Sequence, residues 1–178
     1  MRTVKPQILL GGCVFAAVLA LAASLVIEPT PPLTYRQGGY KSPGMSEAEW
    51  QFHLLGRHIT TVMGIDVVFP KPEEMRPDLL GSAYPGIRKI VIKPSLTPVE
   101  RLQVLAHEAA HFLQPPNLGR AEEEIFADSV AEAVAQQLGF GDPLIFQRYQ
   151  AGFKTGVGVR KIFKNEIQWA VEVLVGPR

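Results

Sequence analysis

Two histidines and a glutamate in the segment His107-Glu108-Ala109-Ala110-His111 have the types and the spacing of a catalytic metal site. On an α-helix, residues i and i+4 lie on one face about 6 Å apart. Two imidazole nitrogens placed in this way can each reach one Zn²⁺ at about 2.0–2.1 Å. Glu108 follows the first histidine directly, so its carboxylate can take a proton from a metal-activated water. The sequence therefore predicts a hydrolytic zinc site with His107 and His111 as ligands and Glu108 as base.

The residues around this segment predict the helix that the spacing requires. Thr97-Pro98-Val99-Glu100 has the form of a capping box with proline at the first helical position. Apolar residues then recur at helical spacing, and Pro115-Pro116 ends the element. These apolar residues are Leu102, Leu105, Ala106, Ala109, Ala110 and Leu113. We therefore expect both histidines on one face of this helix.

A catalytic zinc site usually has three protein ligands and one open position, and the next predicted helix offers the third ligand. That helix runs from about Arg120 to Leu138, with Gly139 as its C-cap. One stripe of the helix carries small residues and two carboxylates, namely Glu124, Ala127, Asp128, Ala131 and Ala135. Small residues let two helices approach closely, so Glu124 can complete the site. Asp128, one turn on, can accept the free ring N–H of a ligand histidine.

Other glutamates and histidines of the chain are also considered as metal ligands. Glu122 and Glu123 precede Glu124 and remain alternatives as the third ligand, although glutamates in a first helical turn also favour the helix dipole. His53 and His58 are five residues apart on a different predicted helix and do not share a face. We interpret these two histidines as ordinary surface or core residues.

The two motifs together resemble the gluzincin metallopeptidases, in which an HExxH helix is followed on the next helix by Glu-x-x-Ala-Asp. The short gap between the motifs and the small size are similar to the minimal gluzincins, including ImmA/IrrE-like proteins, over about Ser46–Gly139. The resemblance implies a zincin-like domain. It also implies that His107, His111 and Glu124 are the zinc ligands. Glu108 would be the general base, and Asp128 would be a carboxylate behind the ligands.

The resemblance also suggests how a substrate is held. Gly86–Ile92 resembles the family's edge strand, so an extended peptide is expected to pair with the Ile87–Ile92 edge. Tyr149 is a candidate for the family's oxyanion-stabilising residue. The favoured alternative for Tyr149 is packing in a short helix that begins at Asp142-Pro143.

The N-terminal segment 1–27 predicts a transmembrane signal anchor or a signal peptide. Ile8–Ile27 is uncharged and long enough to span a hydrocarbon core of about 30 Å, and Arg2 and Lys5 precede it. We expect a membrane-anchored protein with an extracytoplasmic catalytic domain. Cleavage after Ala20-Leu21-Ala22 would instead give a secreted protein, and lipidation at Cys13 is a third alternative.

The remaining chain predicts one α+β domain, mainly helical with a small sheet. Residues 28–45 form a Pro/Gly-rich linker, and 46–178 form the zincin-like metallopeptidase domain. Within that domain we expect further helices, strands and loops, namely helices at 46–63, 143–150 and 162–174, strands at 65–69 and 87–92, and loops at 70–85 and 152–158. Cys13 is the only cysteine, so the domain has no disulfide.

The charge of the chain indicates no nucleic-acid partner. The 18 Lys and Arg residues nearly balance the 17 Asp and Glu residues, and no basic stripe is present. We expect a zinc-dependent metallopeptidase whose partners are a protein or peptide substrate and, through the N-terminal helix, the membrane. The alternative is a non-catalytic zinc-binding interaction module of a membrane or envelope assembly. Its structural site would need a fourth ligand from His53 or His58.

Overall fold

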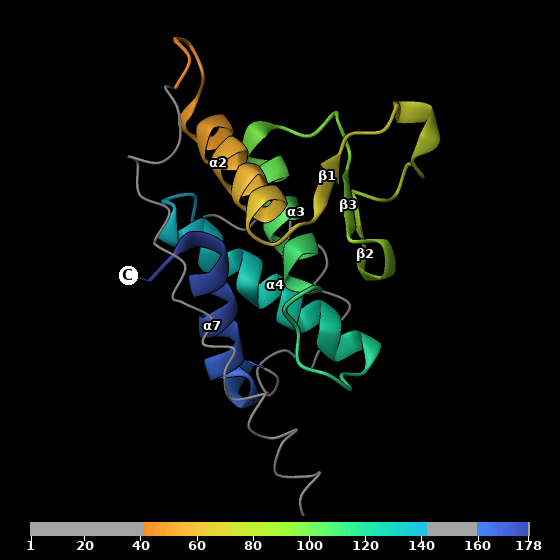
Figure 1. The fold of residues 1–178 in the computed structure, drawn as a ribbon, viewed down its shortest axis with the longest axis vertical. Helices are drawn as coiled ribbons and strands as arrows, with labels where there is room; N and C mark the ends of the chain where they lie inside the picture. The colour runs from red at the N-terminus through yellow and green to blue at the C-terminus, as the bar shows by residue number, and fades with distance from the viewer. Residues whose placement is uncertain (1–40, 142–159, 178) are drawn as a thin grey trace, which may run out of the picture. The chain divides into compact units, whose positions relative to one another are not determined.

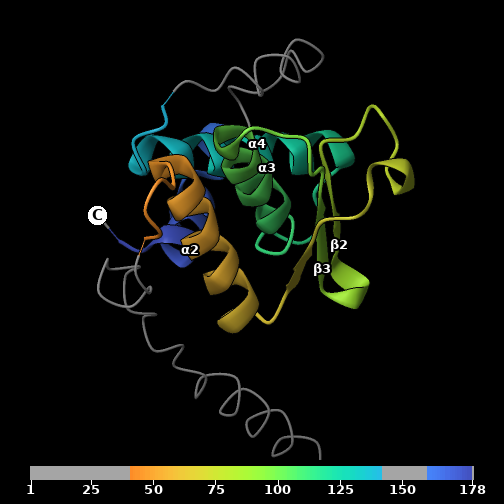
Figure 2. The same cartoon turned by 90° about the horizontal axis from the view of Figure 1, so that it is seen from above.

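Helix α3 (Pro98–Ala110) lies at the centre of the fold and carries the first motif. The computed structural model describes residues 41–141 and 160–177. Figures 1 and 2 show α3 between helix α2 (Glu47–Thr61) on one side and a small sheet on the other. Helix α4 (Arg120–Gln137) packs along α3, and helix α7 (Lys164–Val175) packs on α4. The prediction of a mainly helical α+β domain is confirmed.

The helices begin where the capping residues predicted. The Thr97 side chain accepts a hydrogen bond from the Glu100 backbone N–H, and the Glu100 carboxylate accepts one from the Thr97 backbone N–H in return. Ser46 caps α2 by accepting from the backbone N–H of Glu49. Gly139, at φ +84°, follows α4 in the left-handed conformation that favours glycine at a helix end.

The sheet has three strands in the order β1-β3-β2, and its topology corrects the sequence prediction. Strand β1 (Asp66–Val68) pairs in parallel with β3 (Lys89–Ile92), and β2 (Gly81–Tyr84) pairs antiparallel with β3. The prediction that Ile87–Ile92 is an edge strand was wrong, since β3 is paired on both sides. The predicted loop 70–85 contains the outer strand β2 and a short 3₁₀ helix, η1 (Pro72–Glu74). A strand in the middle of a sheet has no free backbone groups for a substrate.

The turn between β2 and β3 explains why β3 starts later than predicted. A second 3₁₀ helix, η2 (Pro85–Ile87), occupies the turn, and Arg88 follows it in the left-handed region at φ 51°. The Arg88 guanidinium donates to the backbone carbonyls of Met63 and Gly64. These bonds fasten the hairpin to the loop before β1, so Ile87 and Arg88 belong to the turn and not to the strand.

The core joins α3 to every neighbouring element. Ile90 and Ile92 of β3 are fully buried. The helices meet through small side chains, including Ala109, Ala110, Ala127 and Ala131, all fully buried. The predicted small-residue stripe of α4 therefore faces the core, and it lets α4 lie close enough to α3 for side chains of both helices to share one site.

Several sequence predictions concern residues outside the described ranges. These are the segments 1–27 and 143–150, most of the linker 28–45, the glycine-rich loop 152–158, and Tyr149. Within residues 41–141 and 160–177, no helix is both long and apolar enough to cross a bilayer. The predicted spanning segment Ile8–Ile27 lies outside these residues and stays a prediction.

Candidate metal centre

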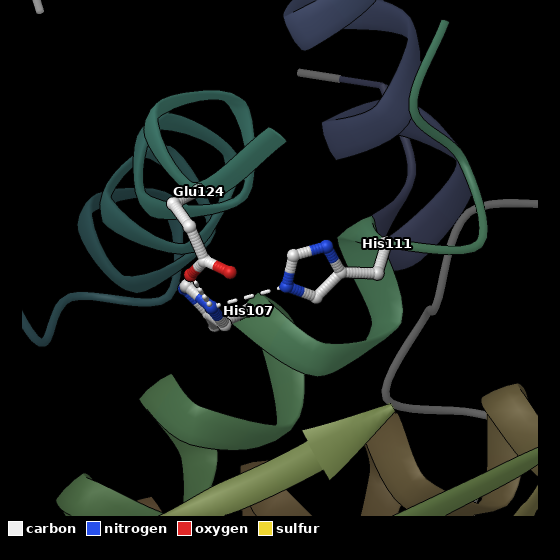
Figure 3. A group of neighbouring side chains, drawn as sticks. All are labelled: His107, His111 and Glu124. Carbon is white, nitrogen blue, oxygen red and sulfur yellow. Dashed lines mark hydrogen bonds and ion pairs between the residues drawn. The ribbon is translucent and has the colours of Figure 1, made fainter. Parts of the chain in front are cut away.

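Side chains from two helices converge on one point at the end of α3. His107 comes from α3, His111 is the C-cap of α3, and Glu124 comes from α4. Figure 3 shows both rings and the carboxylate turned toward one another. One ligand atom from each residue lies within 4.8 Å of the others. The Nε2 atoms of the two histidines are 3.3 Å apart, and His107 Nε2 is 3.4 Å from Glu124 Oε2.

The end of α3 differs from the prediction without moving the second histidine. The helix ends at Ala110, with His111 as its C-cap, whereas the apolar pattern suggested a helix as far as Leu113. The backbone N–H groups of Phe112 and Leu113 donate to carbonyls three residues back, which tightens the last turn. His111 still has right-handed helical angles (φ −61°, ψ −19°), so it lies one turn after His107 as the motif requires.

The three consecutive glutamates of α4 make different contacts. The Glu122 carboxylate accepts from the backbone N–H of Gly119 and caps the helix at 2.9 Å. The Glu123 carboxylate accepts from the Gln114 side-chain amide at 3.1 Å. Among the three, Glu124 joins the two histidines in the cluster. The geometry therefore favours Glu124 as the third ligand over the alternatives Glu122 and Glu123.

Asp128 lies behind His107, on the side away from the cluster centre. Its Oδ1 is 3.0 Å from His107 Nδ1, and the aspartate is buried. Burial alone lowers the pKa of His107, but the hydrogen bonds with Asp128 and Glu124 outweigh burial and raise it to about 10. Glu124 and Asp128 thus contact the two ring nitrogens of His107, and both carboxylates favour its charged form.

The pKa values of the other two members of the cluster are both lowered. Burial, and then the charge of His107, lowers the pKa of His111, so that its ring stays neutral. The hydrogen bond with His107 lowers the pKa of Glu124, so that its carboxylate stays charged. Ligand atoms must be unprotonated to bind a metal, and a bound cation would replace the positive charge on His107.

Glu108 is buried between α3 and strand β2. Its side chain is 7% exposed, and its carboxylate accepts a backbone hydrogen bond from Ala83 of β2. Burial raises the pKa of Glu108 to about 7, against the opposing charge of His107. A carboxyl group whose pKa lies near neutrality can both take and return a proton, which is the requirement for a general base.

Gly81 lets β2 approach Glu108 closely. A Cβ atom at this position would lie 2.6 Å from Val104 Cγ1, 2.8 Å from Glu108 Oε1 and 2.9 Å from Glu108 Cγ. These distances are shorter than van der Waals contact, so a larger residue fits only if the strand or the side chains of Val104 and Glu108 move. The strand and the helix together therefore fix the carboxylate of Glu108.

A cavity of about 620 Å³ opens onto the cluster. Its wall includes apolar side chains of the segment before β2, strand β2 itself, and the polar residues of α3 and α4. His107, Glu108, His111, Glu124 and Asp128 all line this cavity. A substrate in the cavity would therefore meet the outer strand on one side and the cluster on the other.

The donor set fits a divalent metal ion. Two imidazoles and one carboxylate are a common ligand set of catalytic zinc, which leaves one position open. A structural site needs a fourth ligand, and His53 and His58 do not supply it. His58 Nε2 is 2.8 Å from the carbonyl oxygen of Val173 in α7, and His53 is exposed on α2.

Part of the chain matches a known protein family. Residues 60–141 match the family model of the IrrE N-terminal-like domain, peptidase family M78. Residues 60–141 are therefore similar to an IrrE N-terminal-like domain. No curated protein matches the chain, and no solved structure does. The IrrE N-terminal-like segment contains the strands, α3, α4 and the whole cluster, and the predicted resemblance to this group is confirmed. The match indicates a metallopeptidase-like domain.

Two residues that contact the site, Gly81 and Gln114, were not identified from the sequence. Gly81 lies in a run of small residues that has no clear strand pattern, and only its position before a Pro-Gly turn pointed to a hairpin. Gln114 contacts His111 from three residues further along the chain, at 3.2 Å between Gln114 Oε1 and His111 Nδ1. A single glutamine near the end of a helix carries no sequence signal of such a contact.

Proposed function

We propose that this protein is a zinc-dependent metallopeptidase that hydrolyses peptide bonds. The observation that carries the proposal is the convergence of His107, His111 and Glu124 on a cavity that also holds the buried carboxylate of Glu108. The match to the IrrE N-terminal-like domain supports the same class of reaction. Neither histidine suggested as a structural fourth ligand joins the cluster, so the non-catalytic alternative gains no support.

In the proposed mechanism, His107, His111 and Glu124 would hold the ion. A bound zinc ion supplies a Lewis acid that polarises a carbonyl group and lowers the pKa of water toward 7. Glu108 takes a proton from the attacking water and gives it to the leaving amine. The hydrogen bond from Ala83 and the contact with Gly81 hold the Glu108 carboxylate in place for both transfers.

We propose that an extended peptide binds along β2 and not along β3. Strand β2 is an outer strand of the sheet and lines the cavity, whereas β3 is central. A peptide added to β2 gains main-chain hydrogen bonds, which give affinity with little side-chain selectivity. The substrate class that fits is therefore a protein segment or peptide in extended conformation.

Metal content tests the site directly. We expect the purified full chain to retain about one zinc ion per molecule and Glu124→Ala to lose it, because the variant removes one of three ligands. Metal analysis after dialysis against a weak chelator measures this. Glu122→Ala is the matched control, since it removes the same charge from the same turn but leaves the cluster intact. Equal zinc content in the two variants would exclude Glu124 as a ligand.

Asp128 is expected to increase the affinity for zinc without being a ligand itself. Its carboxylate lies 3.0 Å from the outer ring nitrogen of His107, where it sets the ring's orientation and basicity. Asp128→Ala should weaken zinc affinity by about 10–100-fold. Competition with a chelating dye gives the affinity of parent and variant, and an unchanged value would remove Asp128 from the site.

We propose from the sequence that the domain is extracytoplasmic and anchored by Ile8–Ile27. Arg2 and Lys5 would stay on the cytoplasmic side, so Glu28 and the residues after it should lie across the membrane. A reporter that works only outside the cytoplasm should be active when fused after Arg178, and protease added to spheroplasts should cut within 28–44. A fusion that works only in the cytoplasm, with that segment protected, would reverse the orientation.

A further inference from the structure

The outer ring nitrogens of the two histidines have different partners. His107 Nδ1 lies 3.0 Å from a carboxylate oxygen of Asp128, which is a direct contact with a charged group. His111 Nδ1 lies 3.2 Å from Oε1 of Gln114, which is a neutral amide. An amide can present either its oxygen or its nitrogen to a ring. The orientation of Gln114 therefore decides whether His111 meets an acceptor or a donor.

Glu123 determines that orientation. The Gln114 Nε2 group donates to Glu123 Oε1 at 3.1 Å, and a carboxylate can only accept. The amide nitrogen must therefore face Glu123, which leaves the amide oxygen facing His111. An acceptor at this place requires a proton on Nδ1 of His111, and a ring that binds a metal through Nε2 carries its proton on Nδ1. The lone pair of Nε2 then points to the cluster, where a metal ligand needs it.

The same contacts connect the two helices of the site. Gln114 lies in the turn after α3, and Glu123 lies in the first turn of α4. Gln114 and Glu123 both line the cavity beside His111. Each histidine is thus connected to a carboxylate of α4, His107 directly to Asp128 and His111 through Gln114 to Glu123.

We propose that Gln114 and Glu123 form a relay that positions His111 for metal binding. Gln114 is the positioning residue, and Glu123 acts through it by fixing the direction of the amide. The inference rests on the proposed metal site, and it adds a second orienting pair to the one formed by Asp128 and His107. Outer partners of this kind typically change metal affinity by about 10–100-fold when they are removed.

A double-mutant cycle on zinc affinity tests the relay. In the full chain, Gln114→Ala should weaken zinc binding by about 10–100-fold in competition with a chelating dye. Glu123→Ala should weaken it less, and the effect of Glu123→Ala should shrink in the Gln114→Ala background, because the relay no longer exists there. An equal effect of Glu123→Ala in both backgrounds would mean that its charge acts on the ion without Gln114, and would overturn the relay.

A swap of the two side chains tests the direction of the bonds. In Gln114→Glu/Glu123→Gln, a carboxylate at position 114 accepts from both His111 and the amide at 123, so zinc affinity should stay close to that of the parent chain. In Gln114→Glu alone, two carboxylates face each other, and affinity should fall. Gln51→Ala is the matched control, since Gln51 also donates to a glutamate, Glu47, but on α2. A swap variant as weak as Gln114→Ala would contradict the proposal.

The proton on His111 Nδ1 gives a readout that needs no metal. In the metal-free full chain, NMR should show this proton as a slowly exchanging resonance that is lost in Gln114→Ala. In the swap variant it should return further downfield, because a charged acceptor makes a stronger hydrogen bond. An unchanged resonance in Gln114→Ala would overturn the relay. A chain that binds no zinc but shows these shifts would refute the metal site and leave the relay intact.

Discussion

Replacing Glu108 by glutamine is expected to remove hydrolysis while the fold and the bound zinc remain. The substitution keeps the size of the side chain but removes the group that takes the proton, and Glu108 is not among the three clustered ligands. General base catalysis contributes about 10²–10⁴-fold, so the rate should fall by that amount or more. Cleavage of a mixture of unstructured peptides, followed by mass spectrometry, measures the loss.

Two companion measurements make this result specific. Zinc content should equal that of the parent chain, and thermal unfolding should show a folded protein. A variant that lost zinc as well would place Glu108 among the ligands, since a base alone does not hold the ion. Full activity of Glu108→Gln with zinc bound would refute the proposed mechanism.

Replacing Gly81 by alanine is expected to disable the site from the neighbouring strand. The added Cβ would lie 2.6 Å from Val104 Cγ1 and 2.8 Å from Glu108 Oε1, so strand or base must shift. Overpacking of this kind costs about 1–3 kcal/mol of stability. A displacement of about 1 Å at a reacting group can cost about 10²-fold in rate. Chemical denaturation and the peptide assay measure the two effects separately.

The variants around Gly81 distinguish displacement of the base from general damage. Adding Val104→Ala to Gly81→Ala removes the closest contact but not the two with Glu108, so stability should recover while hydrolysis stays low. Gly86→Ala is the control, because a Cβ there meets nothing within 4 Å. If Gly81→Ala with Val104→Ala restored hydrolysis fully, Gly81 would matter only for packing.

The sequence alone determined the helix of the first motif. Its start depends on Thr97 and Glu100, which bond to each other within a single turn, and on Pro98 at the first helical position. The spacing of His107 and His111 then fixes their common face, because helical geometry repeats every 3.6 residues. Such interactions are local, so they can be deduced from neighbouring residues without knowledge of the rest of the chain.

The sheet order could not be deduced in this way. The residues of β2, from Gly81 to Tyr84, are small or polar and show no apolar alternation. They form a strand because β3 pairs with them on one side and α3 packs against them. The strong apolar pattern of β3 reflects its burial in the middle of the sheet, and for that reason the most recognisable strand is not the edge open to a substrate.

The three glutamates of α4 show which features the sequence determines and which depend on the tertiary structure. Local rules placed Glu122, Glu123 and Glu124 in one helical turn, but side chains of one type in adjacent positions carry no information on their partners. In the structure the three side chains have different partners. Glu122 contacts Gly119, Glu123 contacts Gln114, and Glu124 contacts His107. The partners of Glu123 and Glu124 come from beyond α4, from the turn after α3 and from α3 itself. Their contacts therefore depend on the small buried side chains that bring α3 and α4 together, which only the packed structure decides.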